Sequence, residues 1–213
     1  IATGYDGRLT SPSLHKALCE GLKDSGAKVL NIGMGPTPMT YFSHFHLNAD
    51  AVIMVTGSHN PSEYNGFKMV INKQSFFAEN IQNLQKLIDE VKLEFSEGQI
   101  INEDITQDYI DRDLININLK RKLKIAWDPG NGAMGKVTRK ITEKLFNSEN
   151  IIINEEVDGN FPNHHPDPTV PKNMIQLIQA VKKNSCDIGL AFDGDGDRLG
   201  VIDNLGNIVW ADQ

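Results

Sequence analysis

Two patterns of apolar and polar residues alternate along this chain, one typical of buried strands and one typical of helices. Short, nearly continuous apolar runs are typical of strands buried in a parallel sheet, whereas apolar residues spaced three or four apart mark one face of a helix. In the first half, strands are predicted at residues 1–4, 28–32 and 51–55. The helices between them carry apolar faces formed by Leu14, Leu18 and Leu22, and then by Met39, Phe42 and Phe45.

The same order of elements recurs in the second half. Strands are predicted at residues 123–127, 151–154 and 188–192, with helices around Val137, Ile141 and Leu145 and over residues 172–183. Further strand-like runs follow at residues 67–71, 199–202 and 208–210. This alternation favours the α/β class, with two topologically similar, mixed but mostly parallel sheets that carry helices on both faces.

A segment of helical pattern separates the two units. One long helix is predicted from the apolar positions Ile81, Leu84, Ile88, Val91 and Phe95, and a second helix is predicted near residues 109–117. We therefore place the boundary near residue 118, with an N-terminal domain at residues 1–118 and a second domain at residues 119–213.

Composition narrows the classes of protein. A chain of 213 residues with 39% hydrophobic residues can bury one large core or two ordinary ones, and no apolar run reaches the roughly 18 residues that a membrane span needs. The net charge of −7 argues against a nucleic-acid surface. Cys19 and Cys186 match no metal or redox spacing, which is typical of reduced cysteines in a cytoplasmic protein.

The candidate functional residues gather where predicted strands end. Open α/β sheets bind ligands at the carboxyl ends of their strands. In this chain those ends are the loops at residues 4–8, 57–60, 128–135 and 193–198, and all four are rich in glycine and polar residues.

Three aspartates alternate with glycines directly after one of these strands, at Asp193, Asp195 and Asp197. Three neighbouring carboxylates repel one another and raise the pKa of at least one of them unless a cation neutralises the charge. Hard oxygen ligands that converge on one point suit Mg²⁺. The run is not an EF-hand, because its sixth position is Arg198 instead of glycine.

Three roles are open to Ser58. As a hydrolase nucleophile it lacks the Gly-x-Ser-x-Gly elbow, because Asn60 stands at the last position, and His59 is poorly placed to take its proton. As a turn residue it can hydrogen-bond nearby backbone. As a phosphate carrier it needs a metal and cations beside it, which the aspartates together with Lys68 and Arg198 can provide.

A second signal favours a different function. Gly130, Gly132 and Gly135 follow a predicted strand and open a predicted helix, and Glu155 and Glu156 come about twenty residues later. This spacing is that of the dinucleotide-binding fingerprint with its ribose-binding acid. A dinucleotide-binding oxidoreductase is therefore an alternative, although the fingerprint explains neither Ser58 nor the aspartates.

Several segments resemble the α-D-phosphohexomutase family. Thr-Gly-Ser-His-Asn-Pro at residues 56–61, followed by Asn-Gly-Phe-Lys at 65–68, is similar to the active-site serine loop of that family, and Asp-Gly-Asp-Gly-Asp-Arg at 193–198 is similar to its metal loop. Residues 131–135 and 161–168 resemble further family segments, so the resemblance covers essentially the whole chain. The residues around Ser58 are most similar to those of the bacterial phosphomannomutase/phosphoglucomutase branch.

The resemblance implies an isomerase of carbohydrate metabolism that interconverts hexose 1-phosphates and 6-phosphates of mannose, glucose or both. Phosphorylated Ser58 would donate its phosphoryl group to the sugar, with glucose 1,6-bisphosphate or mannose 1,6-bisphosphate as intermediate and activator. Mg²⁺ would be held by Asp193, Asp195 and Asp197 together with a phosphoryl oxygen on Ser58.

The resemblance also implies roles for the neighbouring residues. His59 and Arg198 would position the transferring group, Lys68 would assist with a proton or a charge at the reacting hydroxyl, and Asn60 would bind phosphate. Arg8, at a neighbouring strand end, would either add charge for phosphate binding or form a salt bridge with Asp6 or another acid. The expected partners are small-molecule hexose phosphates, with no nucleic acid and no membrane, and the sequence does not specify an oligomeric state.

Members of that family also carry an arginine-bearing N-terminal segment and two further domains, which read the sugar hydroxyls and hold the distal phosphate. This sequence starts after the point where that N-terminal segment would lie, and it ends at Gln213, before the two further domains. We therefore interpret it as the first two of four domains. We expect these residues alone to bind hexose phosphate weakly and to turn over little. A further alternative is a non-catalytic phosphosugar-binding homologue in which Ser58 is never phosphorylated.

Overall fold

The structure is a computed structural model that describes residues 1–90 and 94–210. Among these residues a first sheet has six strands in the order β5-β4-β3-β1-β2-β6. Their bounds are β1 (Ala2–Tyr5), β2 (Lys28–Met34), β3 (Ala51–Val55), β4 (Phe67–Ile71), β5 (Gln74–Phe76) and β6 (Gln99–Asn102). Pairing is parallel between β1, β2, β3 and β6 and antiparallel from β3 to β4 to β5. Short strands β5 and β6 were not among the predicted elements.

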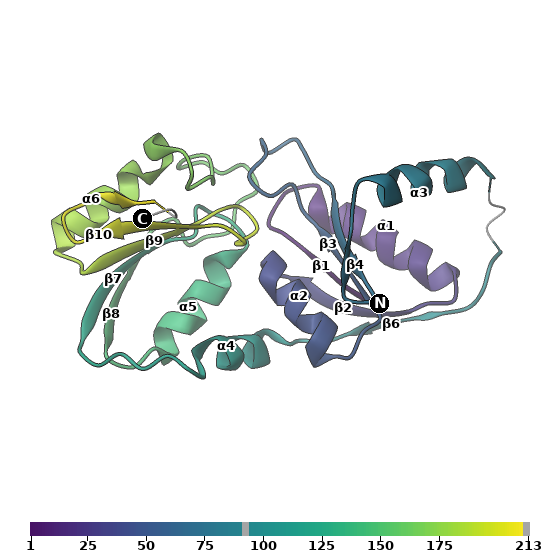
Figure 1. The fold of residues 1–213 in the computed structure, drawn as a ribbon, viewed down its shortest axis with the longest axis horizontal. Helices are drawn as coiled ribbons and strands as arrows, with labels where there is room; N and C mark the ends of the chain where they lie inside the picture. The colour runs from purple at the N-terminus through teal and green to yellow at the C-terminus, as the bar shows by residue number, and fades with distance from the viewer. Residues whose placement is uncertain (91–93, 211–213) are drawn as a thin grey trace.

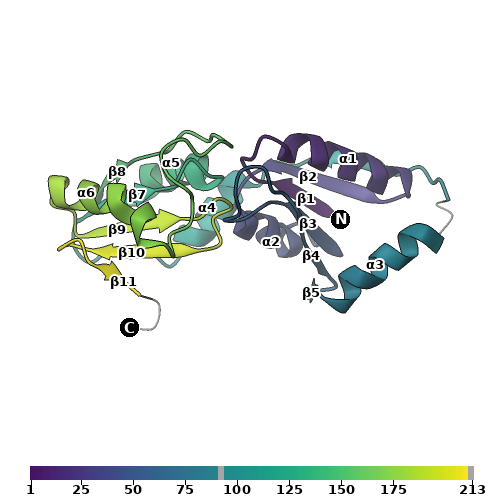
Figure 2. The same ribbon diagram turned by 90° about the horizontal axis from the view of Figure 1, so that it is seen from above.

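Helices α1 (Ser11–Asp24) and α2 (Thr37–His46) pack on this sheet from opposite sides (Figure 2). Each begins with a proline in its first turn, where the missing N–H costs no hydrogen bond. In α1 the residues Ser11, His15 and Cys19, spaced four apart, form the buried face.

The long helix α3 (Glu79–Glu90) differs in extent from the prediction. Its predicted apolar positions Ile81, Leu84 and Ile88 are exposed. Val91 lies outside the described residues, and Phe95 lies after the helix, in a stretch without regular structure, with 79% of its surface exposed. The assignment of Phe95 to the helix was therefore wrong, because a pattern of apolar spacing alone does not mark where a helix ends.

Within the described part of the chain, the second sheet has five strands in the order β11-β10-β9-β7-β8. Their bounds are β7 (Leu123–Asp128), β8 (Ser148–Ile152), β9 (Ile188–Phe192), β10 (Leu199–Asp203) and β11 (Ile208–Val209). Strands β8, β7 and β9 are parallel, and β10 and β11 are antiparallel additions. Strand β8 begins and ends earlier than predicted.

Successive residues of β7 point to opposite faces and fill two different apolar clusters. Ile125 and Trp127 pack with α5 (Met134–Lys144), whereas Ala126 packs with α6 (Ile175–Asn184), which follows the short 3-10 helix η1 (Pro171–Met174). The sheet is therefore covered on both faces. The predicted fold class, two mixed α/β units with helices on both faces of each sheet, is confirmed.

The two units share one apolar core through α4 (Thr106–Leu114). Tyr109 and Ile110 of this helix belong to the same buried cluster as Ile32 and Met39 of the first unit and Ile125 of the second. The two units thus lie side by side, with the loops at their strand ends meeting between them (Figure 1). The boundary near residue 118 stays a prediction, since α4 contacts both α2 and α5.

Candidate active site

The serine loop after β3 and the aspartate loop after β9 come from different units and meet at one point. The hydroxyl of Ser58 donates a hydrogen bond to Oδ2 of Asp193 at 3.1 Å. These residues are 135 positions apart in the chain, so the shared core of the two units brings together the two motifs that carry the chemistry.

Ser58 has a backbone conformation that is unusual for a residue with a side chain. Its φ is 51°, in the left-handed region, and its N–H donates to the hydroxyl of Thr56 at 2.8 Å. The Nδ1 atom of His59 lies 3.3 Å from the Ser58 hydroxyl, and the Asn60 N–H closes the turn on the carbonyl of Gly57 at 2.9 Å. Such backbone strain persists where the surroundings fix it, and it is common at functional sites.

The three aspartates form a compact cluster of carboxylates. One oxygen from each of Asp193, Asp195 and Asp197 lies within 4.8 Å of the others, and the first two residues are fully buried. The backbone N–H groups of Asp197 and Arg198 donate to Oδ1 of Asp193 at 3.0 Å each. Oδ1 of Asp195 is buried, and it has no hydrogen-bond partner among the residues that the structure describes. This unpartnered oxygen and the all-carboxylate donor set fit a hard divalent cation such as Mg²⁺.

Burial and the charge of Asp195 raise the pKa of Asp193 to about 7. Burial alone would also raise the pKa of Asp195, but the charge of Lys68 and its hydrogen bond outweigh burial, so the pKa of Asp195 is lowered. The pKa values of these two neighbouring carboxylates are therefore shifted in opposite directions. The two carboxylates repel each other, and a cation bound between them would reduce this repulsion.

Lys68 supplies part of that positive charge from β4. Its Nζ atom lies 2.6 Å from Oδ2 of Asp195 and 2.6 Å from Oδ2 of Asp197. Burial lowers the pKa of the ammonium, and the two carboxylates raise it by more, so the pKa of Lys68 is raised overall. The structure thus places Lys68 within the carboxylate cluster, and its role in catalysis stays a prediction.

Thr37, at the first turn of α2, contacts the aspartate loop, and this contact was not predicted from the sequence. Its N–H donates to the carbonyl of Asp195 at 2.8 Å, and its hydroxyl donates to the Asp195 carboxylate at 2.5 Å. The available signal was Thr37 between Pro36 and Pro38, which marks a helix N-terminus with free N–H groups. No motif connects that position to a loop 158 residues away.

The two candidate arginines differ in their surroundings. Arg198 is partly exposed beside the aspartate loop, with Nη1 3.9 Å from Oδ1 of Asp167. Arg8 is 1% exposed and lies beneath the serine loop, where its guanidinium donates to backbone carbonyls. Its Nε lies 3.2 Å from Oδ2 of Asp6, so of the two roles expected for Arg8 the structure shows the salt bridge with Asp6 and not an open phosphate ligand.

The glycine loop of the dinucleotide fingerprint is packed against its own unit. A Cβ atom at Gly135 would lie 2.0 Å from the carbonyl oxygen of Glu155, so this glycine serves the close approach of two backbone segments. The Ala133 N–H, just before α5, already donates to the carbonyl of Gly194 at 3.0 Å. The alternative of a dinucleotide-binding oxidoreductase finds no support.

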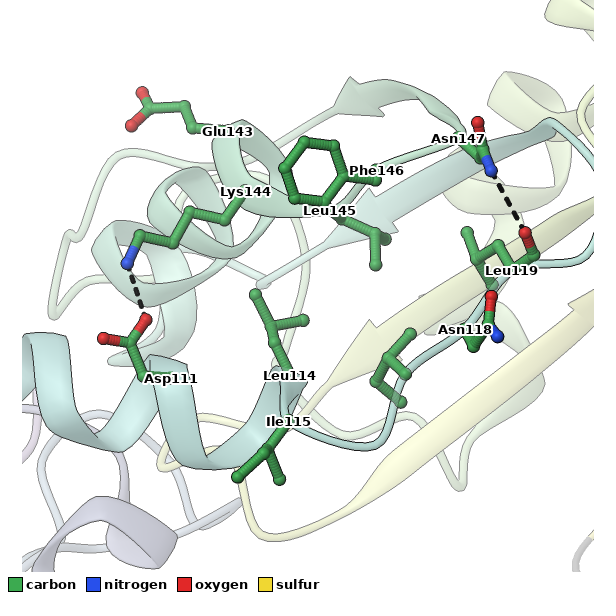
Figure 3. A pocket seen from close by; sticks show the side chains of 11 residues that line it. Asp111, Leu114, Ile115, Asn118, Leu119, Glu143, Lys144, Leu145, Phe146 and Asn147 are labelled. Carbon is green, nitrogen blue, oxygen red and sulfur yellow. Dashed lines mark hydrogen bonds and ion pairs between the residues drawn. The ribbon is translucent and has the colours of Figure 1, made fainter.

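A separate hollow of about 600 Å³ lies away from both loops, between the end of α4, the following linker and the end of α5 (Figure 3). Leu114, Ile115 and Phe146 line it, and the ammonium of Lys144 pairs with Asp111 at 2.6 Å at one side. Its walls are mostly apolar, and among the described residues that line it the lysine Lys144 is paired with Asp111. Within residues 1–90 and 94–210, no helix has the length and apolarity required to cross a membrane.

Comparison with known proteins agrees with this geometry. The family model described as phosphoglucomutase/phosphomannomutase, alpha/beta/alpha domain I, matches residues 1–94, and the model for alpha/beta/alpha domain II of the same family matches residues 103–206. A phosphoglucomutase from Neisseria gonorrhoeae is 45% identical over 215 residues, with 100% of this chain and 46% of that protein covered. A phosphomannomutase/phosphoglucomutase from Pseudomonas putida is 45% identical over 213 residues, with the same coverage.

Solved structures lead to the same family. The crystal structure of a phosphoglucomutase/phosphomannomutase family protein from Burkholderia thailandensis superposes with a TM-score of 0.93 at 40% identity, covering 99% of this chain and 48% of that one. The chain therefore spans about half the length of the relatives it matches. Since the two family models together cover nearly all of it, the chain belongs to the phosphoglucomutase/phosphomannomutase family of the bacterial α-D-phosphohexomutases.

Proposed function

We propose that this chain provides the phosphoserine and the metal site of a phosphohexose mutase. The observation that carries the proposal is the contact of 3.1 Å between the hydroxyl of Ser58 and the carboxylate of Asp193. A phosphate on Ser58 would extend into the aspartate cluster, where its negative charge needs a cation. The substrates would be hexose 1-phosphates and 6-phosphates of glucose, mannose or both.

When bound, Mg²⁺ would be held by Asp193, Asp195 and Asp197 together with a phosphoryl oxygen on Ser58, and it would supply positive charge to the transferring group. The bond between phosphorus and Ser58 Oγ breaks as a bond to the sugar hydroxyl forms, which yields a 1,6-bisphosphosugar. That intermediate then returns its other phosphoryl group to Ser58, and a hexose phosphate with the phosphate at the other position leaves.

The other residues of the site position and neutralise this group. His59 touches the Ser58 hydroxyl, so it orients the seryl oxygen, and Asn60 closes the loop that presents it. Lys68 assists with charge or proton transfer at the reacting hydroxyl. Arg198 lies on the rim of the site and adds positive charge for the phosphoryl group. Because the chain spans about half the length of its relatives, we propose that these residues alone turn over little.

The test follows conversion of glucose 1-phosphate and mannose 1-phosphate to the 6-phosphates by phosphorus NMR, with Mg²⁺ and a trace of glucose 1,6-bisphosphate. It uses the complete gene product that contains this chain. Ser58→Ala is expected to lower kcat by at least about 1,000-fold, because no carrier remains. The matched control is Ser62→Ala in the same loop, where the hydroxyl donates to the exposed carboxylate of Glu63 at 3.5 Å. A Ser58→Ala variant with the full rate would contradict the proposal, and absence of conversion by the wild-type protein would favour a phosphosugar-binding homologue.

A further inference from the structure

The guanidinium of Arg8 is surrounded by carbonyl oxygens that all belong to the serine loop. Nη2 donates to the carbonyl of Ser58 at 2.8 Å and to that of Asn60 at 2.7 Å. Nη1 donates to the carbonyl of Pro61 at 2.6 Å and to that of Tyr64 at 3.0 Å. One side chain thus binds four carbonyls of a loop that has no regular secondary structure.

Four carbonyl dipoles that point at one place repel one another unless a cation lies between them. These carbonyls face the Arg8 guanidinium, whereas the side chain of Ser58 faces the aspartate cluster. In this arrangement Ser58 has a left-handed backbone conformation. Arg8 therefore supplies the interactions that keep this strained conformation. The planar fork of a guanidinium matches two pairs of acceptors, and the compact ammonium of a lysine does not.

The guanidinium is itself held from the other side. Its Nε lies 3.2 Å from Oδ2 of Asp6, which also accepts a hydrogen bond from the hydroxyl of Thr56 at 2.8 Å. The backbone of Gly57 lies directly on the guanidinium, because a Cβ atom there would be 2.6 Å from Cζ of Arg8. Asp6 and Arg8 thus hold the loop immediately before and after Gly57.

The second unit covers the remaining face of Arg8. The ring of Phe161 lies over the guanidinium, with its centroid 5.3 Å from Cζ, and Phe161 is itself buried. Arg8 therefore contacts both the loop that carries Ser58 and the unit that carries Asp193. It is placed to fix the distance between the serine and the carboxylates.

We propose that Arg8 is a positioning residue, which holds the backbone of residues 57–66 so that Ser58 faces the aspartate cluster. Arg8 acts through the loop and does not contact the sugar phosphate. The consequence for catalysis rests on the proposed function, whereas the consequence for the loop does not.

The first test measures amide hydrogen exchange on the complete gene product that contains this chain. In Arg8→Lys, peptides that cover residues 57–66 are expected to exchange at least about tenfold faster than in wild type, because local opening becomes easier. Peptides from β7 and β9 are expected to be unchanged. The matched control is Arg139→Lys, at an exposed arginine that pairs with Glu155 outside the serine loop. Equal exchange of residues 57–66 in wild type and Arg8→Lys would overturn the proposal.

The second test measures mutase kinetics with the complete gene product. Arg8→Lys is expected to lower kcat by about 100-fold and to change KM for the hexose phosphate by less than about threefold, since positioning is lost and binding is kept. A rise in KM with kcat preserved would instead assign Arg8 to phosphate binding and overturn the proposal. Faster exchange of the loop in a protein without mutase activity would reject the proposed function and support the positioning role.

A second variant covers the case in which Arg8→Lys does not fold. Phe161→Leu removes the ring from the guanidinium and leaves every hydrogen bond of Arg8 in place. It is expected to speed exchange at residues 57–66 by a smaller factor, about threefold, without changing β7 or β9. Unchanged exchange of the loop in this variant would also overturn the proposal.

Discussion

The ammonium of Lys68 lies 2.6 Å from Oδ2 of Asp195, although the two residues belong to different units of the chain. The same ammonium reaches Asp197 at the same distance. The positive charge of Lys68 therefore occupies part of the carboxylate cluster that fits a divalent cation. A metal ion bound by these carboxylates would compete with Lys68 for the same oxygen atoms.

Removal of this charge is expected to strengthen metal binding. Lys68→Met should lower the Mg²⁺ dissociation constant by about tenfold in isothermal titration calorimetry, because the ion no longer displaces a cation. The matched control is Lys73→Met, in the turn before β5, where the ammonium lies 5.7 Å from the centroid of the Phe45 ring. An equal or weaker affinity for Mg²⁺ in Lys68→Met would show that Lys68 does not compete with the ion.

Metal binding is also expected to stabilise the fold. A ligand that binds only the native state raises the melting temperature, so saturating Mg²⁺ should raise that of the wild type by a few degrees. Asp195→Asn should lose this rise, because it removes one charge from the cluster and the buried oxygen that has no partner. The control is Asp111→Asn, at an exposed carboxylate that pairs with Lys144. The same Mg²⁺-dependent rise in Asp195→Asn and wild type would argue against the aspartate cluster as the metal site.

A partly buried imidazole gives the fold a defined pH dependence. Nε2 of His164 lies 2.9 Å from Oδ2 of the fully buried Asp128. Burial lowers the pKa of His164, but the hydrogen bond and the charge of Asp128 raise it by more, so the pKa is raised overall. Because the pKa is higher in the folded state, the pair stabilises the protein fully below the unfolded value of about 6.5 and loses this contribution as the pH rises through the folded value.

Urea unfolding of wild type and His164→Gln at several pH values checks this expectation. Glutamine can still donate to Asp128 but does not titrate. The difference in the free energy of unfolding between the two proteins should be largest below about pH 6.5 and should shrink toward pH 9. A difference that is independent of pH, or that grows with pH, would refute the charged pair.

The fold and the chemical groups of the site were largely predictable from the sequence. Apolar periodicity marked most of the strands and helices, and the loops with Ser58 and Asp193 stood out because serine, aspartate and glycine are concentrated where apolar strands end. The short strand β6 was missed, since its four residues pair with β2 at a distance of about 70 positions along the chain, a contact that local pattern does not report.

Side-chain roles that depend on tertiary contacts were not predictable in the same way. Arg8 was expected either as a ligand for phosphate or as the partner of an acid such as Asp6, and its burial between the serine loop and the ring of Phe161 arises from packing between the two units. Thr37 was recognisable only as part of a helix N-terminus, because its hydrogen bonds to Asp195 form between two units that are far apart in the sequence. A sequence motif identifies which groups are present, and the shared core decides which of them touch.

The central claim is that Ser58 carries phosphate. Peptide mass spectrometry measures this directly, on the complete gene product as purified, after incubation with glucose 1,6-bisphosphate and Mg²⁺, and again after addition of a hexose phosphate. The expected result is phosphate on Ser58 that is lost when the hexose phosphate is added. Ser58 that stays unmodified under all three conditions would contradict it.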